Sequence, residues 1–314
     1  MDYQHGTYRQ HRAPADPGRR WAGAGPAPAR AEHRAVDGTE WKRQAGLVGR
    51  LRERERELAA VELLLARGGG VLVVEGRAGI GKTALAEQAG RRAAELGHMV
   101  VRARGSELEA GFAFGVVRQL FERCLADVGT GEREALLAGP AAAVRPLLCG
   151  MSAGEPAGGS SFSVLHGLYW LVANLAASQP VLIVVDDAHW ADEPSLRWLA
   201  YLAPRLEGLA AGLLVALRPG DPASMGAPLL AVRAEAAAVL CPALLSDRAV
   251  SAMVRAAAGS GASDELCAAV YAASGGNPLY LTELLRAAEL GGRPLDELDP
   301  ASCWPEGSTG SGGG

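Results

Sequence analysis

The chain has 314 residues, which suits one large or two modest domains of roughly 150 residues each, and its formal net charge of -4 gives no overall attraction to nucleic acid. The five cysteines are scattered, odd in number and without a C-x-x-C pair, so the sequence predicts neither a disulfide framework nor a zinc site. No apolar run approaches the ~18 residues of a membrane span and the first residues lack the apolar core of a signal peptide, so we expect a cytoplasmic protein with no membrane association.

Residues 1–45 are rich in Arg, Pro, Gly and Ala, and they hold too few large apolar side chains to offset the entropy of ordering. We expect a disordered tail and assign it no function. The composition changes at residue 46, where a folded domain is predicted to begin. Its first element is a charged helix that ends at the glycines of residues 68–70. The apolar face of this helix is predicted to hold Leu51, Leu58, Val61 and Leu65.

The phosphate-binding pattern G-x-x-x-x-G-K-[ST] is satisfied in full by GRAGIGKT at residues 76–83. An apolar strand precedes it at residues 71–74 and good helix formers follow at residues 84–89, which argues against an accidental match in a glycine-rich sequence. The glycines let backbone N–H groups turn toward a phosphate, and the helix directs its positive dipole end at the same anion. We expect Lys82 to reach the β- and γ-phosphates and the Thr83 hydroxyl to hold Mg²⁺. The predicted phosphate-binding residues are Gly76, Arg77, Ala78, Gly79, Ile80, Gly81, Lys82 and Thr83.

Strand and helix patterns alternate after this motif. Residues 99–103 form a second predicted strand, and a loop rich in glycine and serine is predicted at residues 152–161. Alternation of this kind predicts a parallel sheet covered by helices. The helical regions are expected at residues 112–125, 132–148 with an interruption at residues 139–140, and 163–177.

A second chemical centre lies in VLIVVDDAHWAD. Residues 181–185 form a wholly apolar strand, as expected when helices cover both faces of a sheet, and the strand ends in Asp186 and Asp187. This pattern is typical of a Walker B motif, and a carboxylate at the end of such a strand falls at the same sheet edge as the phosphate-binding loop. We expect Asp186 to hold Mg²⁺ and Asp187 to orient and deprotonate the attacking water. The alternative to a Walker B motif is that the two acids have no catalytic role and only end a strand at a solvated edge of the sheet.

His189 and Trp190 follow directly. They could sense the γ-phosphate or pack against the next helix, so we assign them no chemical role. Asp192 and Pro194 suit the first turn of a helix predicted at residues 195–206.

Another apolar strand is predicted at residues 213–217 and ends at Arg218, which would lie near the same edge as Asp186. We predict that Arg218 contacts the γ-phosphate, with a surface salt bridge as the alternative.

Beyond residue 240 the sequence is helical, with glycine-rich breaks at residues 259–261 and 275–278. The folded chain is therefore predicted to divide into a nucleotide-binding domain at residues 46–240 and a small helical lid at residues 241–292. Residues 293–314 are of low complexity and are predicted to be disordered. The lid helices are expected at residues 246–258, 263–273 and 279–290.

Six segments in the same order resemble the ATPase module of the LuxR-type large ATP-binding transcriptional regulators, in the STAND branch of AAA-related P-loop ATPases. The resemblance covers roughly residues 46–290. P-loops alone are widespread, whereas the combination of DDAHWAD with GGNPLYL is much more specific. The segments are LVGRLRERERELAAVELLLARGGG, GRAGIGKT, ELEAGFAFGVVRQLFE, VVDDAHWADEPSLRWLAYL, ALRP and SGGNPLYLTELL.

This resemblance implies an α/β P-loop NTPase fold, with the strand before Arg218 placed between the P-loop strand and the Asp186 strand, followed by a helical lid. The implied cofactors are ATP or ADP with Mg²⁺, bound as a slow switch. Related AAA proteins use Glu as the catalytic acid, so the shorter Asp187 argues against fast turnover. The catalytic residues are then Lys82, Asp187 and Arg218. The family's L-V-G-R segment near the adenine matches Val48, Gly49 and Arg50, and the proline that caps the base matches Pro278.

The leading expectation is a Mg-ATP-binding, slowly hydrolysing signalling ATPase. A nucleotide-dependent interaction module without hydrolysis is the alternative, and a P-loop kinase for a small molecule is disfavoured because the acid pair suits water activation. Family members continue into helical repeats that receive an inducer and a helix-turn-helix that enters DNA, so DNA binding is assigned to no residue of this chain. ATP is the expected partner, and self-association or a regulatory protein partner stays open.

Overall fold

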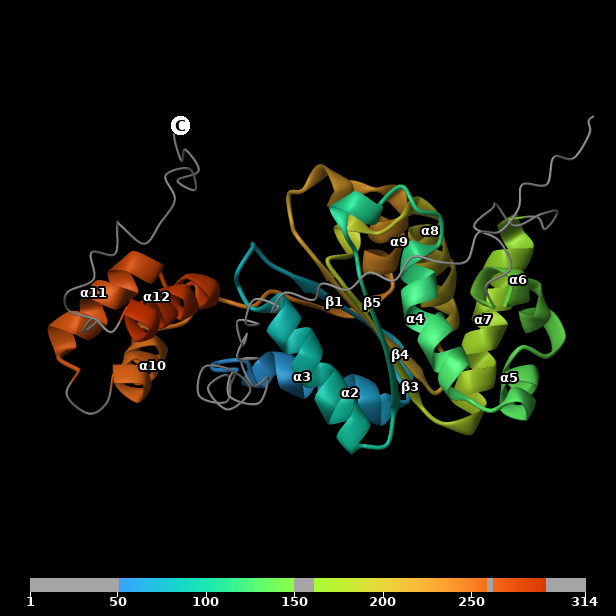
Figure 1. Ribbon diagram of the computed structural model, residues 1–314, viewed down its shortest axis with the longest axis horizontal. Coiled ribbons are helices and arrows are strands. Elements are labelled where there is room, and N and C mark those ends of the chain that lie inside the picture. The colour runs from blue at the N-terminus through green and yellow to red at the C-terminus, as the bar shows by residue number, and fades with distance from the viewer. Residues whose placement is uncertain (1–50, 150–160, 259–261, 292–314) are drawn as a thin grey trace, which may run out of the picture.

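The computed structural model describes residues 51–149, 161–258 and 262–291 (Figure 1). In these ranges the chain forms α/β layers around a five-stranded sheet in the order β2-β3-β4-β1-β5, and every neighbouring pair is parallel. The predicted α/β class with a parallel sheet is confirmed. The strands are β1 (Gly69–Glu75), β2 (Met99–Arg104), β3 (Val181–Asp186), β4 (Ala211–Leu217) and β5 (Ala236–Leu240).

Helices cover both faces of the sheet (Figure 1). Successive residues of a strand point to opposite faces of the sheet. In β1, Leu72 and Val74 therefore pack against two helices on one face, and Val71 and Val73 pack against four helices on the other face. The helices on the first face are α2 (Glu55–Arg67) and α3 (Lys82–Glu95). Those on the second are α4 (Gly115–Asp127), α7 (Ser161–Ser178), α8 (Glu193–Leu202) and α9 (Ala227–Ala234), with the short α5 (Thr130–Leu136) and α6 (Arg145–Leu148) packed beside α7 and α4.

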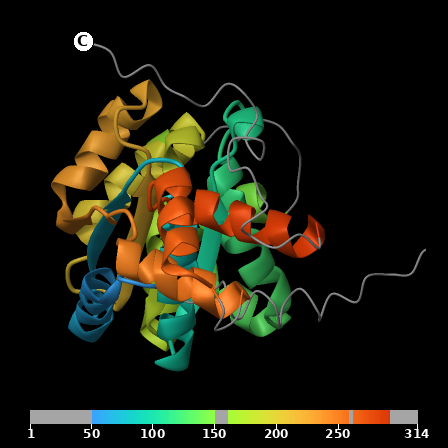
Figure 2. The same ribbon diagram turned by 90° about the vertical axis from the view of Figure 1, so that its left-hand side faces the viewer.

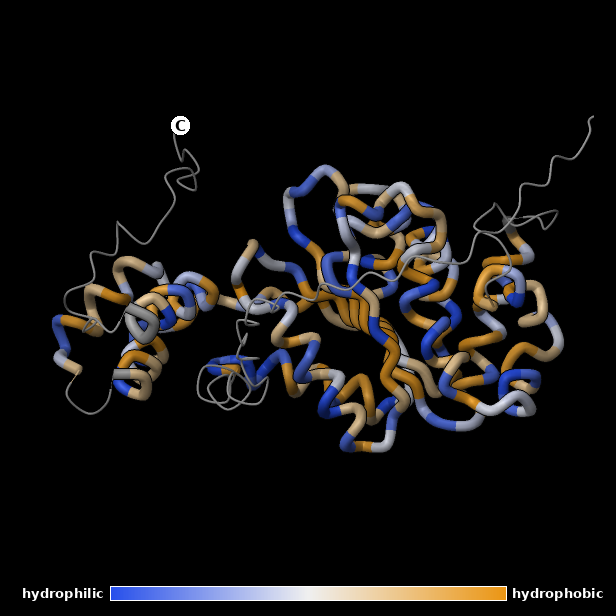
Figure 3. Tube along the Cα trace, viewed as in Figure 1, coloured by the Kyte–Doolittle hydropathy of each residue, from blue (hydrophilic) through white to orange (hydrophobic). Residues whose placement is uncertain are grey.

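The central strands β3 and β4 are buried along their whole length, as their uninterrupted apolar sequences require. Figure 3 shows these strands as a continuous hydrophobic stripe at the centre of the molecule. β4 lies between β1 and β3, as the resemblance implied. The register pairs Leu217 with Glu75 and Val215 with Val185, so the three strands end at one edge.

The sequence interpretation assigned no element to residues 219–240, and this omission was wrong. The structure places α9 and the edge strand β5 there. β5 has the sequence AAAVL, and its burial alternates only between half-buried and exposed. A short alanine-rich edge strand has no clear hydrophobic signal, because a run of alanines is equally typical of a helix.

Asp192 fixes two helices to the segment that follows β3. Its carboxylate caps α8 by accepting a 2.9 Å hydrogen bond from the N–H of Ser195. The same carboxylate accepts from the N–H groups of Phe114 (2.7 Å) and Val116 (3.1 Å) at the start of α4. These bonds explain why α4 begins at Gly115, later than predicted, and α8 at Glu193, earlier than predicted.

The last three helices form a separate layer with its own hydrophobic cluster around Leu245, Val254 and Leu281. Figure 2 shows these orange and red helices in front of the sheet when the molecule is viewed from their side. We call them the lid, and the domain boundary near residue 240 stays a prediction. Its members are α10 (Asp247–Ala258), α11 (Asp264–Ser274) and α12 (Pro278–Gly291).

None of the helices in the described ranges has the length and the apolar character needed to cross a bilayer.

We expect Asp192→Ala to lower the free energy of unfolding by about 2–4 kcal/mol, because three buried N–H groups lose a charged acceptor. Urea denaturation followed by circular dichroism measures the change. Ser263→Ala is the control, because Ser263 is an exposed cap that accepts only from Leu266 and should cost about 1 kcal/mol. Equal losses in the two variants would contradict the double-cap role of Asp192.

Candidate functional site

The loop between β1 and α3 has the backbone conformation that its glycines predict. Gly79 and Gly81 have φ angles of +77° and +98°, in the left-handed region that glycine adopts without strain. No side chain caps the N-terminus of α3, so its first N–H groups stay available to an anion. A Cβ at Gly79 would lie 2.6 Å from Oδ1 of Asn277, so this glycine also permits close contact with the lid.

Lys82 is the first residue of α3 and is 6 % exposed. Its Nζ donates to the carbonyl oxygens of Gly76 (2.8 Å) and Arg77 (3.1 Å) in the loop itself. Burial lowers the pKa of Lys82, while the nearby Asp187 opposes that shift. The amine is therefore held at the centre of the loop, where an incoming phosphate oxygen can replace carbonyl acceptors.

Thr83 and Asp186 lie together although 103 residues separate them. Thr83 Oγ1 donates a 2.6 Å hydrogen bond to Oδ2 of Asp186, whose other oxygen accepts from the N–H of Asp187 at 3.0 Å. A hydroxyl and a carboxylate are hard oxygen ligands of the kind that Mg²⁺ prefers, and phosphate oxygens and waters usually complete such a site. The donor set therefore fits the implied metal.

Asp187 is engaged by an arginine that the sequence interpretation did not select. Its Oδ2 accepts from Nη2 (2.8 Å) and Nε (3.0 Å) of Arg104 at the end of β2. This bond raises the pKa of Arg104 further above its already high range. In the sheet, Arg104 pairs with Asp186 across β2 and β3, so only knowledge of the strand order would have revealed the contact.

Arg218 follows β4 and lines the same cavity as Lys82 and Asp187. Its guanidinium carbon lies 5.2 Å from the centre of the Trp190 ring, within the range of a cation–π contact. Its Nε is buried and has no hydrogen-bond partner in the described structure. The surface salt bridge considered as the alternative does not occur among the described residues.

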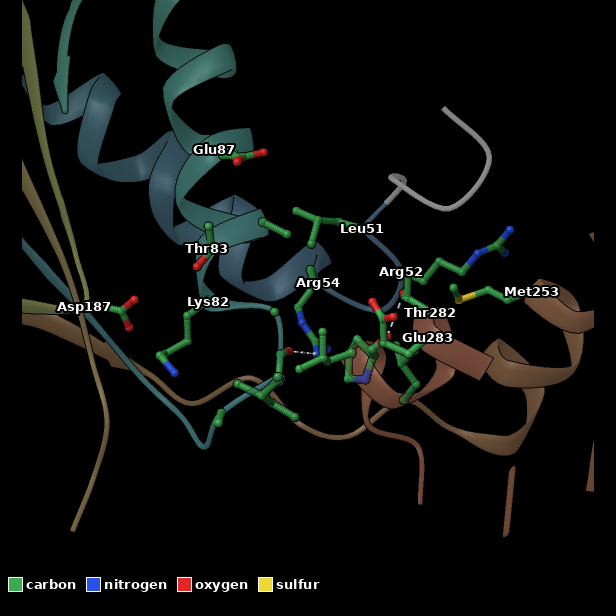
Figure 4. Close-up of a pocket in the computed structure, with 18 of the residues that line it drawn as sticks. Leu51, Arg52, Arg54, Lys82, Thr83, Glu87, Asp187, Met253, Thr282 and Glu283 are labelled. Carbon is green, nitrogen blue, oxygen red and sulfur yellow. Dashed lines mark hydrogen bonds between the residues drawn. The ribbon is translucent and has the colours of Figure 1, made fainter. Parts of the chain in front are cut away.

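The cavity has a volume of about 620 Å³ and lies between the phosphate-binding loop, the segment before α2 and the lid. Figure 4 shows side chains from these three parts directed toward it. Pro278, the predicted adenine contact, lines it. Val48, Gly49 and Arg50 lie outside the described residues. Further lining residues are Leu51, Arg52, Arg54, Met253, Thr282, Glu283 and Arg286.

Arg54 is a second residue that the sequence interpretation missed. It is 3 % exposed, and its Nη2 donates to the carbonyl oxygens of Ile80 (3.1 Å) and Ala243 (2.7 Å). One guanidinium thus joins the segment before α2, the phosphate-binding loop and the connection to the lid. The alternating charges of residues 52–57 resemble a solvated helix face, so nothing in the sequence distinguishes Arg54 from its neighbours.

The lid also bonds to the phosphate-binding loop directly. The side-chain amide of Asn277 donates to Ala78 O (3.3 Å), and the N–H of Leu279 donates to Gly79 O (3.2 Å). On the other side, the Glu53 carboxylate accepts from the N–H (2.8 Å) and hydroxyl (2.5 Å) of Ser246, just before α10. The bonds from Asn277 and Leu279 thus fasten the lid to the loop, and Glu53 fastens the start of the lid to the segment before α2.

Comparison with known families gives the assignment. A family model described as an AAA ATPase domain matches residues 50–216, more than half of the 314 residues. The chain belongs to the family of AAA ATPase domains. Nucleotide binding is therefore the expected activity of this site, and the matched region contains the P-loop and both acids, whereas Arg218 and the lid lie beyond it.

Solved structures of a Cdc6 protein and an ORC1 protein share the fold. Cdc6p from Pyrobaculum aerophilum aligns at a TM-score of 0.52 and 16 % identity, covering 80 % of this chain and 67 % of its own. The Aeropyrum pernix ORC1 protein in complex with DNA aligns at a TM-score of 0.50 and 17 % identity. The alignment covers 81 % of this chain and 63 % of the ORC1 chain. A STAND protein with a tetratricopeptide repeat sensor from Pyrococcus horikoshii aligns at a TM-score of 0.46 and 21 % identity. The alignment covers 75 % of this chain and 30 % of the STAND protein chain.

The AAA ATPase chain thus spans at most about two thirds of these structures. No curated protein matches its sequence.

We expect Arg54→Met to weaken ATP binding at least about tenfold, because the carbonyl oxygens of Ile80 and Ala243 lose their donor beside the loop. Isothermal titration calorimetry with Mg-ATP measures the loss. Arg52→Met is the matched control, since Arg52 lines the same cavity and is only half-buried. A similar loss in both variants would show that only the total positive charge matters.

The hydrogen bonds from Ser246 lower the pKa of Glu53 below its ordinary value of 4.5. A carboxyl group whose pKa is lower in the folded protein than in the unfolded chain stabilises the folded state at pH values above its unfolded pKa. This contribution disappears as the pH falls through the pKa of the folded state. We expect the stability difference between the parent and Glu53→Gln, measured by urea denaturation, to shrink progressively below pH 4.5. Glu55→Gln, an exposed change in the first turn of α2, is the control. A Glu53→Gln difference that is constant with pH would refute the Ser246 contact.

Proposed function

We propose that this AAA ATPase domain is a Mg-ATP-binding, slowly hydrolysing switch of the STAND type, related to the LuxR-type regulators. The observation that carries the proposal is the 2.6 Å bond between Thr83 and Asp186, because it joins the metal ligands of the two nucleotide-binding motifs. We also propose the predicted division into an ATPase domain at residues 46–240 and a lid at residues 241–292, and a cytoplasmic location. Self-association or a regulatory protein partner belongs to the same proposal.

Each side chain has a role that its position supports. The N–H groups of the loop and Lys82 bind the phosphates, while Thr83 and Asp186 hold Mg²⁺. When bound, the metal neutralises charge on the phosphate oxygens. Arg218 adds a positive group on the same side of the cavity, and Pro278 lies against the base.

Asp187 is the acid that orients the attacking water. Its carboxylate is one carbon shorter than that of Glu, and its Oδ2 already accepts two bonds from Arg104. A water that needs this oxygen as its acceptor competes with a charged donor. Both features support slow turnover.

A second candidate, a nucleotide-dependent interaction module without hydrolysis, is favoured by the bonds between the lid and the loop. Asn277 and Leu279 contact Ala78 and Gly79 directly, so occupancy of the loop can bias the lid position whether or not ATP is cleaved.

Phosphate release under multiple-turnover conditions separates the two candidates. We expect slow phosphate release by the parent. Asp187→Asn should keep ATP binding and lose release, and Lys82→Ala should lose both, because its amine is the buried cation at the centre of the loop. ATP binding without any release by the parent would favour the interaction module. Unchanged ATP affinity in Lys82→Ala would reject nucleotide binding at this loop.

A further inference from the structure

The Walker B turn carries an aromatic ring that holds the proposed phosphate-sensing arginine. Trp190 ends the short 3-10 helix Ala188–Trp190, which follows Asp186 and Asp187. The Arg218 guanidinium lies over this indole at 5.2 Å, although the two residues come from neighbouring strands. Residues 186–190 therefore carry both acids and the ring that contacts Arg218.

The arginine has unused hydrogen-bonding capacity in this position. Arg218 Nε is one of the few buried side-chain polar atoms in the described ranges without a hydrogen-bond partner. An unsatisfied buried donor is unfavourable, and a ring face attracts the cation without accepting such bonds in the way an oxygen does. The ring therefore attracts Arg218 without satisfying its donors, so an anionic acceptor in the cavity that Lys82 and Asp187 also line competes with the indole for the guanidinium.

The ring that packs beside the indole does not compete with Arg218. His189 packs against Trp190 with ring centres 4.6 Å apart and is 3 % exposed. Its burial lowers its pKa, so the imidazole stays neutral near pH 7. Among the described residues Arg218 therefore makes the cation–π contact with this ring, and His189 packs beside the ring.

We propose that Trp190 is a specificity-determining residue that sets the relative affinity of this site for nucleoside triphosphate and diphosphate by holding Arg218 over its ring. The proposal rests on the proposed function, in which Arg218 contacts the γ-phosphate. Contact with a third phosphate requires Arg218 to give up the indole, whereas diphosphate binding leaves the contact in place. The charged oxygens attract a guanidinium more strongly than the ring does, so the ring reduces the preference for triphosphate without abolishing it.

The sign of the effect distinguishes this role from simple packing. If Trp190 only filled space, its replacement would alter the affinities for both nucleotides by the same factor. Release of a competing partner of Arg218 instead strengthens triphosphate binding alone. A cation–π contact of ordinary strength corresponds to about a 3- to 10-fold change in affinity.

The experiment compares Trp190→Leu with Trp190→Phe in the full chain, using titration calorimetry with Mg-ATPγS and Mg-ADP. We expect Trp190→Leu to bind ATPγS about 3- to 10-fold more tightly with ADP affinity unchanged, and Trp190→Phe to lie between this variant and the parent because benzene attracts cations more weakly than indole. An equal shift for both nucleotides, or weaker ATPγS binding in Trp190→Leu, would overturn the proposal.

A double-variant cycle separates this proposal from the proposed function. Trp190→Leu should change the ATPγS-to-ADP ratio in the parent and leave it unchanged in an Arg218→Ala background. If Arg218→Ala alone leaves the ratio unchanged, the γ-phosphate role of Arg218 fails first. If Arg218→Ala changes the ratio and Trp190→Leu has the same effect in both backgrounds, only the Trp190 proposal fails.

Fluorescence gives a second readout if Trp190→Leu does not fold. The difference between the parent and the milder Trp190→Phe variant isolates the Trp190 emission. We expect this difference to change on adding Mg-ATPγS and to stay constant on adding Mg-ADP. The same response to both nucleotides would overturn the proposal.

Discussion

Buried charge at the carboxyl edge of the sheet is the constraint on which the rest of the site depends. Lys82, Asp186, Asp187 and Arg54 are all less than 9 % exposed, and an ionised group at such a position is unfavourable unless hydrogen bonds or opposite charges compensate it. Each has a partner within the protein: loop carbonyls for Lys82, Thr83 for Asp186, Arg104 for Asp187, and two distant carbonyls for Arg54. Ligand binding at this edge is therefore an exchange of partners, in which ligand oxygens must compete with internal bonds.

The lid follows from the same constraint. Arg54 lies where the loop, the segment before α2 and the lid connection converge, and its charge is satisfied only if all three keep their positions. Asn277 and Leu279 add bonds from the start of α12 to the loop backbone. The lid has its own hydrophobic cluster, so it can move as a unit when these few polar contacts change. A small number of hydrogen bonds thus connects the phosphate-binding loop to the position of three helices.

Local patterns in the sequence predicted much of this arrangement. The P-loop and the Asp186 strand were recognisable because spacing and apolar runs are local properties, and the place of β4 followed from family resemblance. Arg104 and Arg54 could not be found in this way, because their partners are fixed by strand order and by the approach of the lid. β5 was missed because its run of alanines is typical of a helix, and only pairing with neighbouring β1 makes residues 236–240 a strand.

The backbone at Asp187 constrains which residues position 187 can accept. Asp187 has a φ angle of +46°, in the left-handed region that Asp and Asn adopt more readily than longer side chains. A glutamate there would extend the reach of the acid but would also meet a conformational cost at the residue that starts the 188–190 turn. Replacement of residue 187 by glutamate would therefore require a change in the turn as well, so the backbone conformation favours the short acid at this position.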